Sequence, residues 1–146
     1  MPQPGPNETV LWKNVDPTFQ AGAPRSVDEL PWNEVAAQPG EKAYIYVVME
    51  DGDLRLGSFA EGVKHIDLSG GDPVRAAGLA TFSDGQLVSV DNQSGHYQPF
   101  GATAETEAMA AFGREFGGLA NGAQYTPVPY ARDAGANWYT VPTLGR

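Results

Sequence analysis

The sequence contains no cysteine among its 146 residues. Disulfide bridges, zinc–thiolate centres and cysteine nucleophiles are therefore excluded by composition. Long apolar runs are also missing, since none approaches the about 20 residues that span a bilayer. The first residues carry neither the basic nor the apolar region of a signal peptide. We therefore expect no association with a membrane.

Cationic residues are scarce, because 9 Lys and Arg stand against 18 Asp and Glu, which gives a net charge of -9. This charge repels phosphate backbones over a Debye length of about 8 Å, although a local basic patch would still permit action on RNA. Histidine is scarce too, with 2 residues. Their spacing offers no three-ligand cluster, so no metal is expected.

What the sequence does contain indicates one turn-rich domain. The 18 glycines and 12 prolines punctuate apolar segments. Residues 1–8, with three prolines, are predicted to be a flexible linker tail, as expected for a domain from the end of a longer protein. Residues 9–146 are predicted to form the single domain, which is long enough to bury one core.

The pattern of apolar residues predicts an α+β fold: an antiparallel meander sheet of five to seven strands with one main helix packed on it. Asp84-Gly85 is the clearest two-residue hairpin signal. A helix over 103–116 is predicted, with Thr103 as its cap. The expected strands are 10–12, 42–49, 54–59, 63–68, 76–83 and 86–91, with a short helix over 26–38 and aromatic edge strands within 124–130 and 137–142.

The segment QSGHYQP, residues 93–99, is the first candidate site. His96 is predicted to stand at a sheet end beside a helix N-terminus, where an imidazole can act as acid or base at neutral pH. Gly95 is expected to occupy a conformation or a crowded position that a β-carbon would disturb, and to let a ligand approach the backbone beside Ser94. The alternative is a structural histidine that bonds a turn carbonyl while Tyr97 fills the core.

His65 is the second candidate. In a strand over 63–68, alternation would place His65 and Asp67 on one face and Lys64 on the other. If this strand and the end of the strand at 86–91 are near each other, both histidines share one pocket with Arg75. The alternative is a half-exposed strand histidine beside a solvated aspartate.

Three further motifs are interpreted as structural. Residues 69–72 (SGGD) lack the context of a phosphate loop and are predicted to form a turn. Asp51 and Asp53 begin like a calcium loop without the required Glu, which favours a hairpin turn. The aromatic residues near the C-terminus, among them Trp138 and Tyr139, could stack on bases, but ordinary core packing is the default interpretation.

The stretch 42–99 resembles a module at the C-terminal ends of bacterial polymorphic toxins, including the Rhs type, and the non-IQ region of plant IQ-motif calmodulin-binding proteins. The matching positions are Ala76, Ala77, Gly78, Ser94 to Tyr97, Pro99 and His65. Ile66 and Asp67 replace two serines that follow the first histidine in those sequences. No basic IQ helix is visible, so calmodulin binding is not expected here.

The toxin resemblance implies a secreted effector, delivered into a target cell and acting in its cytoplasm, with an immunity protein as partner. Three functions stay open. The first is NAD-using transfer or hydrolysis, in which a histidine holds the ribose and Tyr97 stacks on nicotinamide. The second is a metal-independent ribonuclease with His65 and His96 as base and acid, helped by Lys64 or Arg75. The third is a non-enzymatic binding module. The net charge favours a small ligand over a polyanion, which ranks NAD first.

Overall fold

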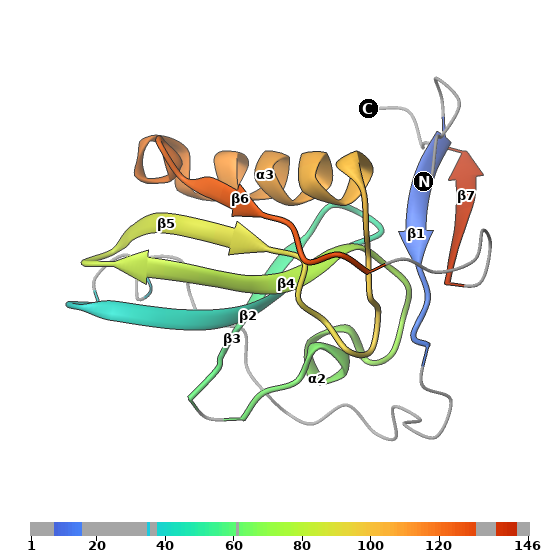
Figure 1. Cartoon of the computed structure of the whole chain (residues 1–146), viewed down its shortest axis with the longest axis horizontal. Coiled ribbons are helices and arrows are strands. Elements are labelled where there is room, and N and C mark those ends of the chain that lie inside the picture. The colour runs from blue at the N-terminus through green and yellow to red at the C-terminus, as the bar shows by residue number, and fades with distance from the viewer. Residues whose placement is uncertain (1–7, 16–34, 36–37, 61, 131–136, 143–146) are drawn as a thin grey trace.

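The computed structural model describes residues 8–15, 35, 38–60, 62–130 and 137–142 (Figure 1). They form an α+β domain with a seven-stranded sheet and one main helix, as the sequence predicted. The elements are β1 (Glu8–Trp12), β2 (Glu41–Met49), β3 (Leu54–Ser58), α2 (His65–Ser69), β4 (Val74–Ser83), β5 (Gln86–Asp91), α3 (Ala102–Phe116), a 3₁₀ turn (Gly117–Ala120), β6 (Gln124–Thr126) and β7 (Trp138–Pro142).

The sheet is organised around β4. Its one edge pairs along β2, which pairs in turn with β3. Its other edge is shared by two strands. β5 pairs with the end of β4, whereas β1 pairs with β4 only at its first residue, Val74, through Trp12. All of these pairs are antiparallel, whereas β6 lies parallel to β5. The sheet is therefore a mixed one, and its central part consists of two hairpins of consecutive strands, β2–β3 and β4–β5, joined by the pairing of β2 with β4.

β1 and β7 form a two-stranded ribbon at one corner of this sheet (Figure 1). Five residue pairs join them, from Glu8 with Pro142 to Trp12 with Trp138. Residues close to both ends of the chain therefore lie side by side. Strand alternation gives the ribbon two faces, and the face with Trp12 and Trp138 packs into a core.

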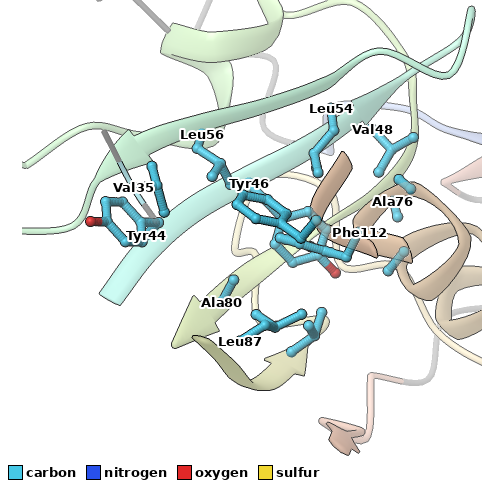
Figure 2. Close-up of a cluster of buried hydrophobic side chains, with 14 of the residues drawn as sticks. Val35, Tyr44, Tyr46, Val48, Leu54, Leu56, Ala76, Ala80, Leu87 and Phe112 are labelled. Atoms are coloured by element: carbon cyan, nitrogen blue, oxygen red, sulfur yellow. The ribbon is translucent and has the colours of Figure 1, made fainter. Parts of the chain in front are cut away.

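A hydrophobic core lies on each face of the sheet. The sequence of β2 is continuously apolar because both faces of this strand are buried. Tyr44, Tyr46 and Val48 point to one core, and Ile45 and Val47 point to the other. α3 covers the first face, and Figure 2 shows Phe112 against the side chains of β2 to β5. The second face is covered by α2 and the segment after β5, with Ile66, Leu68 and Tyr97 buried there.

The predicted strand over 63–68 is wrong, because residues 65–69 form the helix α2. Its N-terminus is closed by Asp67, whose carboxylate accepts a hydrogen bond from the Lys64 N–H at 2.9 Å. Gly70 ends it in a left-handed conformation with φ of 67°. The alternation of VKHIDL is misleading because Ile66 and Leu68 are both buried in the second core from one short helical turn, and His65 is buried as well.

The other sequence predictions have mixed outcomes. The Asp84-Gly85 hairpin is confirmed, with positive φ at both turn residues. α3 begins one residue before Thr103 and its N-cap is Gly101, so Thr103 is not the cap. The predicted helix over 26–38 lies outside the described residues except for its C-terminal end, where Val35 is helical and buried. None of the helices in the described ranges is long and apolar enough to cross a membrane.

Candidate functional site

The signature loop, residues 93–99, is fixed by hydrogen bonds from distant parts of the chain. Within it, the Gln98 N–H donates to the Ser94 carbonyl at 2.8 Å, and Gln98 adopts a positive φ of 46°. The Asn137 amide donates to the carbonyls of Tyr97 and Gln98 at 2.9 and 3.1 Å. Ser94 is buried and its hydroxyl accepts from the Tyr97 N–H at 3.3 Å. The conformation of the loop is thus fixed by hydrogen bonds to the rest of the fold.

Tyr97 joins this loop to the end of α2. Its hydroxyl donates to the Asp72 carbonyl at 2.6 Å and lies 2.7 Å from the Ser69 hydroxyl. Since the phenol has one proton, Ser69 is the donor in the second bond. Burial raises the pKa of Tyr97 to about 12, and the side chain is 0% exposed. Its ring therefore has no open face on which nicotinamide could stack.

His65 is also buried. Its Nε2 lies 2.8 Å from the Gly78 carbonyl, which accepts, so Nε2 carries the proton. The pKa of His65 is lowered to about 4, mainly by burial and to a smaller extent by the nearby His96, against the opposing effect of the Gly78 bond. The imidazole is neutral at pH 7. It is therefore a structural hydrogen-bond donor and is poorly suited to general acid catalysis.

His96 is the more accessible histidine, since it is half-buried. Its carbonyl accepts a hydrogen bond from the Val15 N–H at 2.6 Å. The effect of His96 on the pKa of His65 places the two imidazoles in one neighbourhood. Lys64 and Asp67 cap α2 beside them. Seven of the eight predicted site residues thus gather around α2 and the signature loop.

The expectation for Gly95 is wrong. Gly95 is exposed, a β-carbon built on it would meet nothing within 4 Å, and its φ lies outside the left-handed region. The position therefore has no need of glycine for backbone conformation or for close packing.

Arg75 lies apart from the histidines. It is the extra residue of a β-bulge in β4, where Val48 of β2 pairs with Ala76 and Met49 with Val74. The bulge directs its side chain to Glu50 and α3: Nε donates to the Glu50 carbonyl at 2.7 Å, and Nη1 pairs with the Glu107 carboxylate at 3.1 Å.

Arg75 instead lines a pocket of about 560 Å³, here named the ribbon groove. Its lining residues come from the β1–β7 ribbon, the turn after β2, the start of β3, and the start of β4 with the turn before it. Its lining residues are Thr9, Met49, Glu50, Asp51, Arg55, Asp72, Pro73, Arg75, Tyr139, Val141 and Pro142. Its volume lies within the range of small-molecule sites.

Sequence reasoning found only Arg75 of this groove. The other lining residues come from both ends of the chain and from two turns interpreted as structural. No local spacing connects them, because the groove exists only once β7 has paired with β1. Within the described ranges, no group of three or more His, Asp or Glu side chains is arranged to hold a metal ion.

Replacing Tyr97 with phenylalanine should lower the free energy of unfolding by about 1 to 3 kcal/mol, because the Asp72 carbonyl and the Ser69 hydroxyl lose a buried partner. Urea denaturation measures the loss. The matched control is Tyr44→Phe, because the Tyr44 hydroxyl makes no hydrogen bond within the described residues. This substitution should change the free energy of unfolding by less than about 0.5 kcal/mol. An equal effect of both substitutions would contradict the role given to the Tyr97 hydroxyl.

The structure thus defines an α+β domain with a signature loop anchored by the buried Tyr97, a buried His65 in α2, and a surface groove. Residues 31–104 match the family described as IQ motif-containing protein middle domain, and the chain belongs to this family. No curated protein and no solved structure matches it. The match confirms the resemblance to the IQ-motif proteins and covers α2, β4 and the signature loop. The toxin resemblance gains no support from it and stays a prediction.

Proposed function

We propose that this chain is a non-enzymatic binding module whose ligand site is the ribbon groove. The groove carries the proposal, because it combines about 560 Å³ of space with apolar walls and charged side chains from four separate segments. The signature loop then serves the fold. It holds α2 against the sheet and keeps the second core closed.

The chemistry of the two signature residues supports this proposal over catalysis. The Nε2–H of His65 donates a hydrogen bond to a backbone carbonyl, and the hydroxyl of Tyr97 donates to another backbone carbonyl. A ribonuclease that pairs His65 with His96 would need an imidazole that exchanges protons near pH 7, and burial opposes this in His65. The NAD-using function, the delivery of the domain as a toxin and neutralisation by an immunity protein stay predictions.

The proposal is tested with the purified chain in two measurements. First, NAD concentration and RNA integrity are followed in one reaction, and both should stay unchanged. Second, a fragment library is added to isotope-labelled protein, and amide shifts should concentrate at Arg75, Tyr139 and Val141. Val141→Trp should fill the groove and abolish these shifts. The control Val88→Trp, at an exposed position outside the groove, should leave them intact.

Two results would overturn the proposal. One is consumption of NAD or RNA that His96→Ala abolishes while circular dichroism stays unchanged, since that would make the half-buried histidine catalytic. The other is a set of fragment shifts confined to residues 93–99, which would move the ligand site from the groove to the signature loop.

A further inference from the structure

We infer that the ribbon groove holds a basic, extended segment of a partner protein, with a lysine or arginine side chain seated between Glu50, Asp72 and Tyr139. This inference rests on the proposed binding function and adds the chemistry of the ligand. It follows from the excess of carboxylates over cations around the groove, and from the aromatic ring in its wall.

Both arginines of the groove already have partners inside the protein. Arg75 binds the Glu50 carbonyl and the Glu107 carboxylate, and its side chain is 13% exposed. Arg55 pairs with the Asp53 carboxylate at 3.1 Å and donates to the Leu68 carbonyl at 2.8 Å. An anionic ligand would have to compete with these carboxylates for each guanidinium.

The carboxylates of the groove outnumber the cations. Glu50, Asp51 and Asp72 line it and are exposed. With Asp53 and Glu107, the partners of the arginines, five carboxylates stand against Arg55, Arg75 and one further cation, Lys13. The whole chain carries the same sign, with a net charge of -9. The local field therefore attracts a cation and repels a second anion.

The wall opposite Glu50 already attracts an ammonium group. Lys13 Nζ lies 5.9 Å from the centre of the Tyr139 ring, which is the geometry of a cation–π contact. Leu11 pairs with Tyr139 across the ribbon, and Lys13 follows Leu11 by two residues, so alternation places Lys13 on the groove face. The Glu50 carboxylate is close enough to help raise the pKa of Tyr139, after the effect of burial.

The apolar part of the groove favours a peptide side chain over a bare cation. Met49, Pro73, Val141 and Pro142 supply surface for the aliphatic stem of a lysine or arginine. β7 is also the last strand on its side of the sheet, so its outer edge has no strand partner among the described residues. An extended segment can lie along such an edge and place alternate side chains on the groove face.

The test uses the full chain and three fluorescent peptides of repeated X-Ser units, in which X is lysine, glutamine or glutamate, so that every X lies on the same face of an extended peptide. Fluorescence anisotropy at low salt should show the lysine peptide binding at least about tenfold more tightly than the glutamine peptide, and its affinity should fall as salt is raised. Isotope-labelled protein should show the shifts of the lysine peptide at Tyr139 and Val141.

The double variant Glu50→Gln with Asp72→Asn should weaken binding of the lysine peptide about tenfold. The control, Glu41→Gln with Glu115→Gln, removes the same charge from exposed positions outside the groove and should change affinity by less than about twofold. Equal losses in both variants would show a general attraction to an acidic protein and would overturn the inference. Displacement of the lysine peptide by spermidine at an equal concentration of amines would also overturn the inference, because it would show that the groove does not distinguish a peptide from a free polyamine.

The failure of this inference is distinguishable from the failure of the proposed function. Tighter binding of the glutamine or glutamate peptide, with shifts at Tyr139, would overturn the cationic ligand and keep the groove as the site. Shifts from all ligands confined to the signature loop would overturn both.

Discussion

Gly78→Ala is expected to lower the free energy of unfolding by more than about 3 kcal/mol, the largest effect that we predict for a single substitution. A β-carbon at Gly78 would lie 1.9 Å from the Asp91 carbonyl oxygen and 2.6 Å from its carbon. The same oxygen accepts the Tyr46 hydroxyl at 2.6 Å. Because backbone atoms of β5 cannot move without breaking this bond and the strand pairing, the strain has no inexpensive relief.

Two other glycines make matched controls for urea denaturation. At Gly57 the nearest atom is Val63 Cγ1 at 2.5 Å, a side-chain atom that can turn away, so Gly57→Ala should cost clearly less than Gly78→Ala. At Gly95 no atom lies within 4 Å, so Gly95→Ala should change stability by less than about 1 kcal/mol. A loss at Gly78 no larger than the loss at Gly95 would contradict the close approach of β4 to Asp91.

Acidification should destabilise the domain through His65 by about 3 kcal/mol between pH 6.5 and pH 4. In the folded state burial lowers the pKa of this imidazole from 6.5 to about 4. Between pH 6.5 and pH 4, His65 is therefore protonated in the unfolded chain but stays neutral in the folded chain. Stability is complete above pH 6.5, falls as the pH drops, and levels off below pH 4, where both states are protonated.

The comparison that isolates this effect is His65→Gln, which removes the titrating group and leaves a neutral side chain. The variant should lose about 3 kcal/mol of the pH dependence across this window, measured by urea denaturation at each pH. The half-buried His96 is the control position, and His96→Gln should leave most of the slope in place. Titration of the His65 imidazole by NMR near pH 6.5 would contradict the prediction directly.

The signature residues show which parts of the candidate site could be predicted from the sequence. It selected His65 and residues 94–97 as a related set, and the structure does bring them together around α2. It did not show that Tyr97 and His65 are buried, since a histidine between a glycine and a tyrosine has the same local pattern in either case. Burial here depends on Asn137 and Gly78, which are remote in the sequence.

The sequence by itself determined those features that depend on neighbouring residues. The β-branched and aromatic run in 42–49 predicted β2, the Asp84-Gly85 pair predicted the hairpin that leads into β5, and apolar spacing predicted α3. Each of these is a local consequence of backbone conformation or of burial on one face. The net charge is likewise fixed by composition alone, and it underlies the prediction of a small ligand over a polyanion.

Only the tertiary structure decided α2 and the ribbon groove. VKHIDL alternates like a strand, but the Asp67 cap and the left-handed Gly70 stabilise a helix once its apolar side chains find the sheet. The groove needs β7 to pair with β1 across almost the whole chain, which brings Tyr139 beside Glu50. Such contacts follow from the packing of the complete fold, because no spacing along the chain records which distant segments become neighbours.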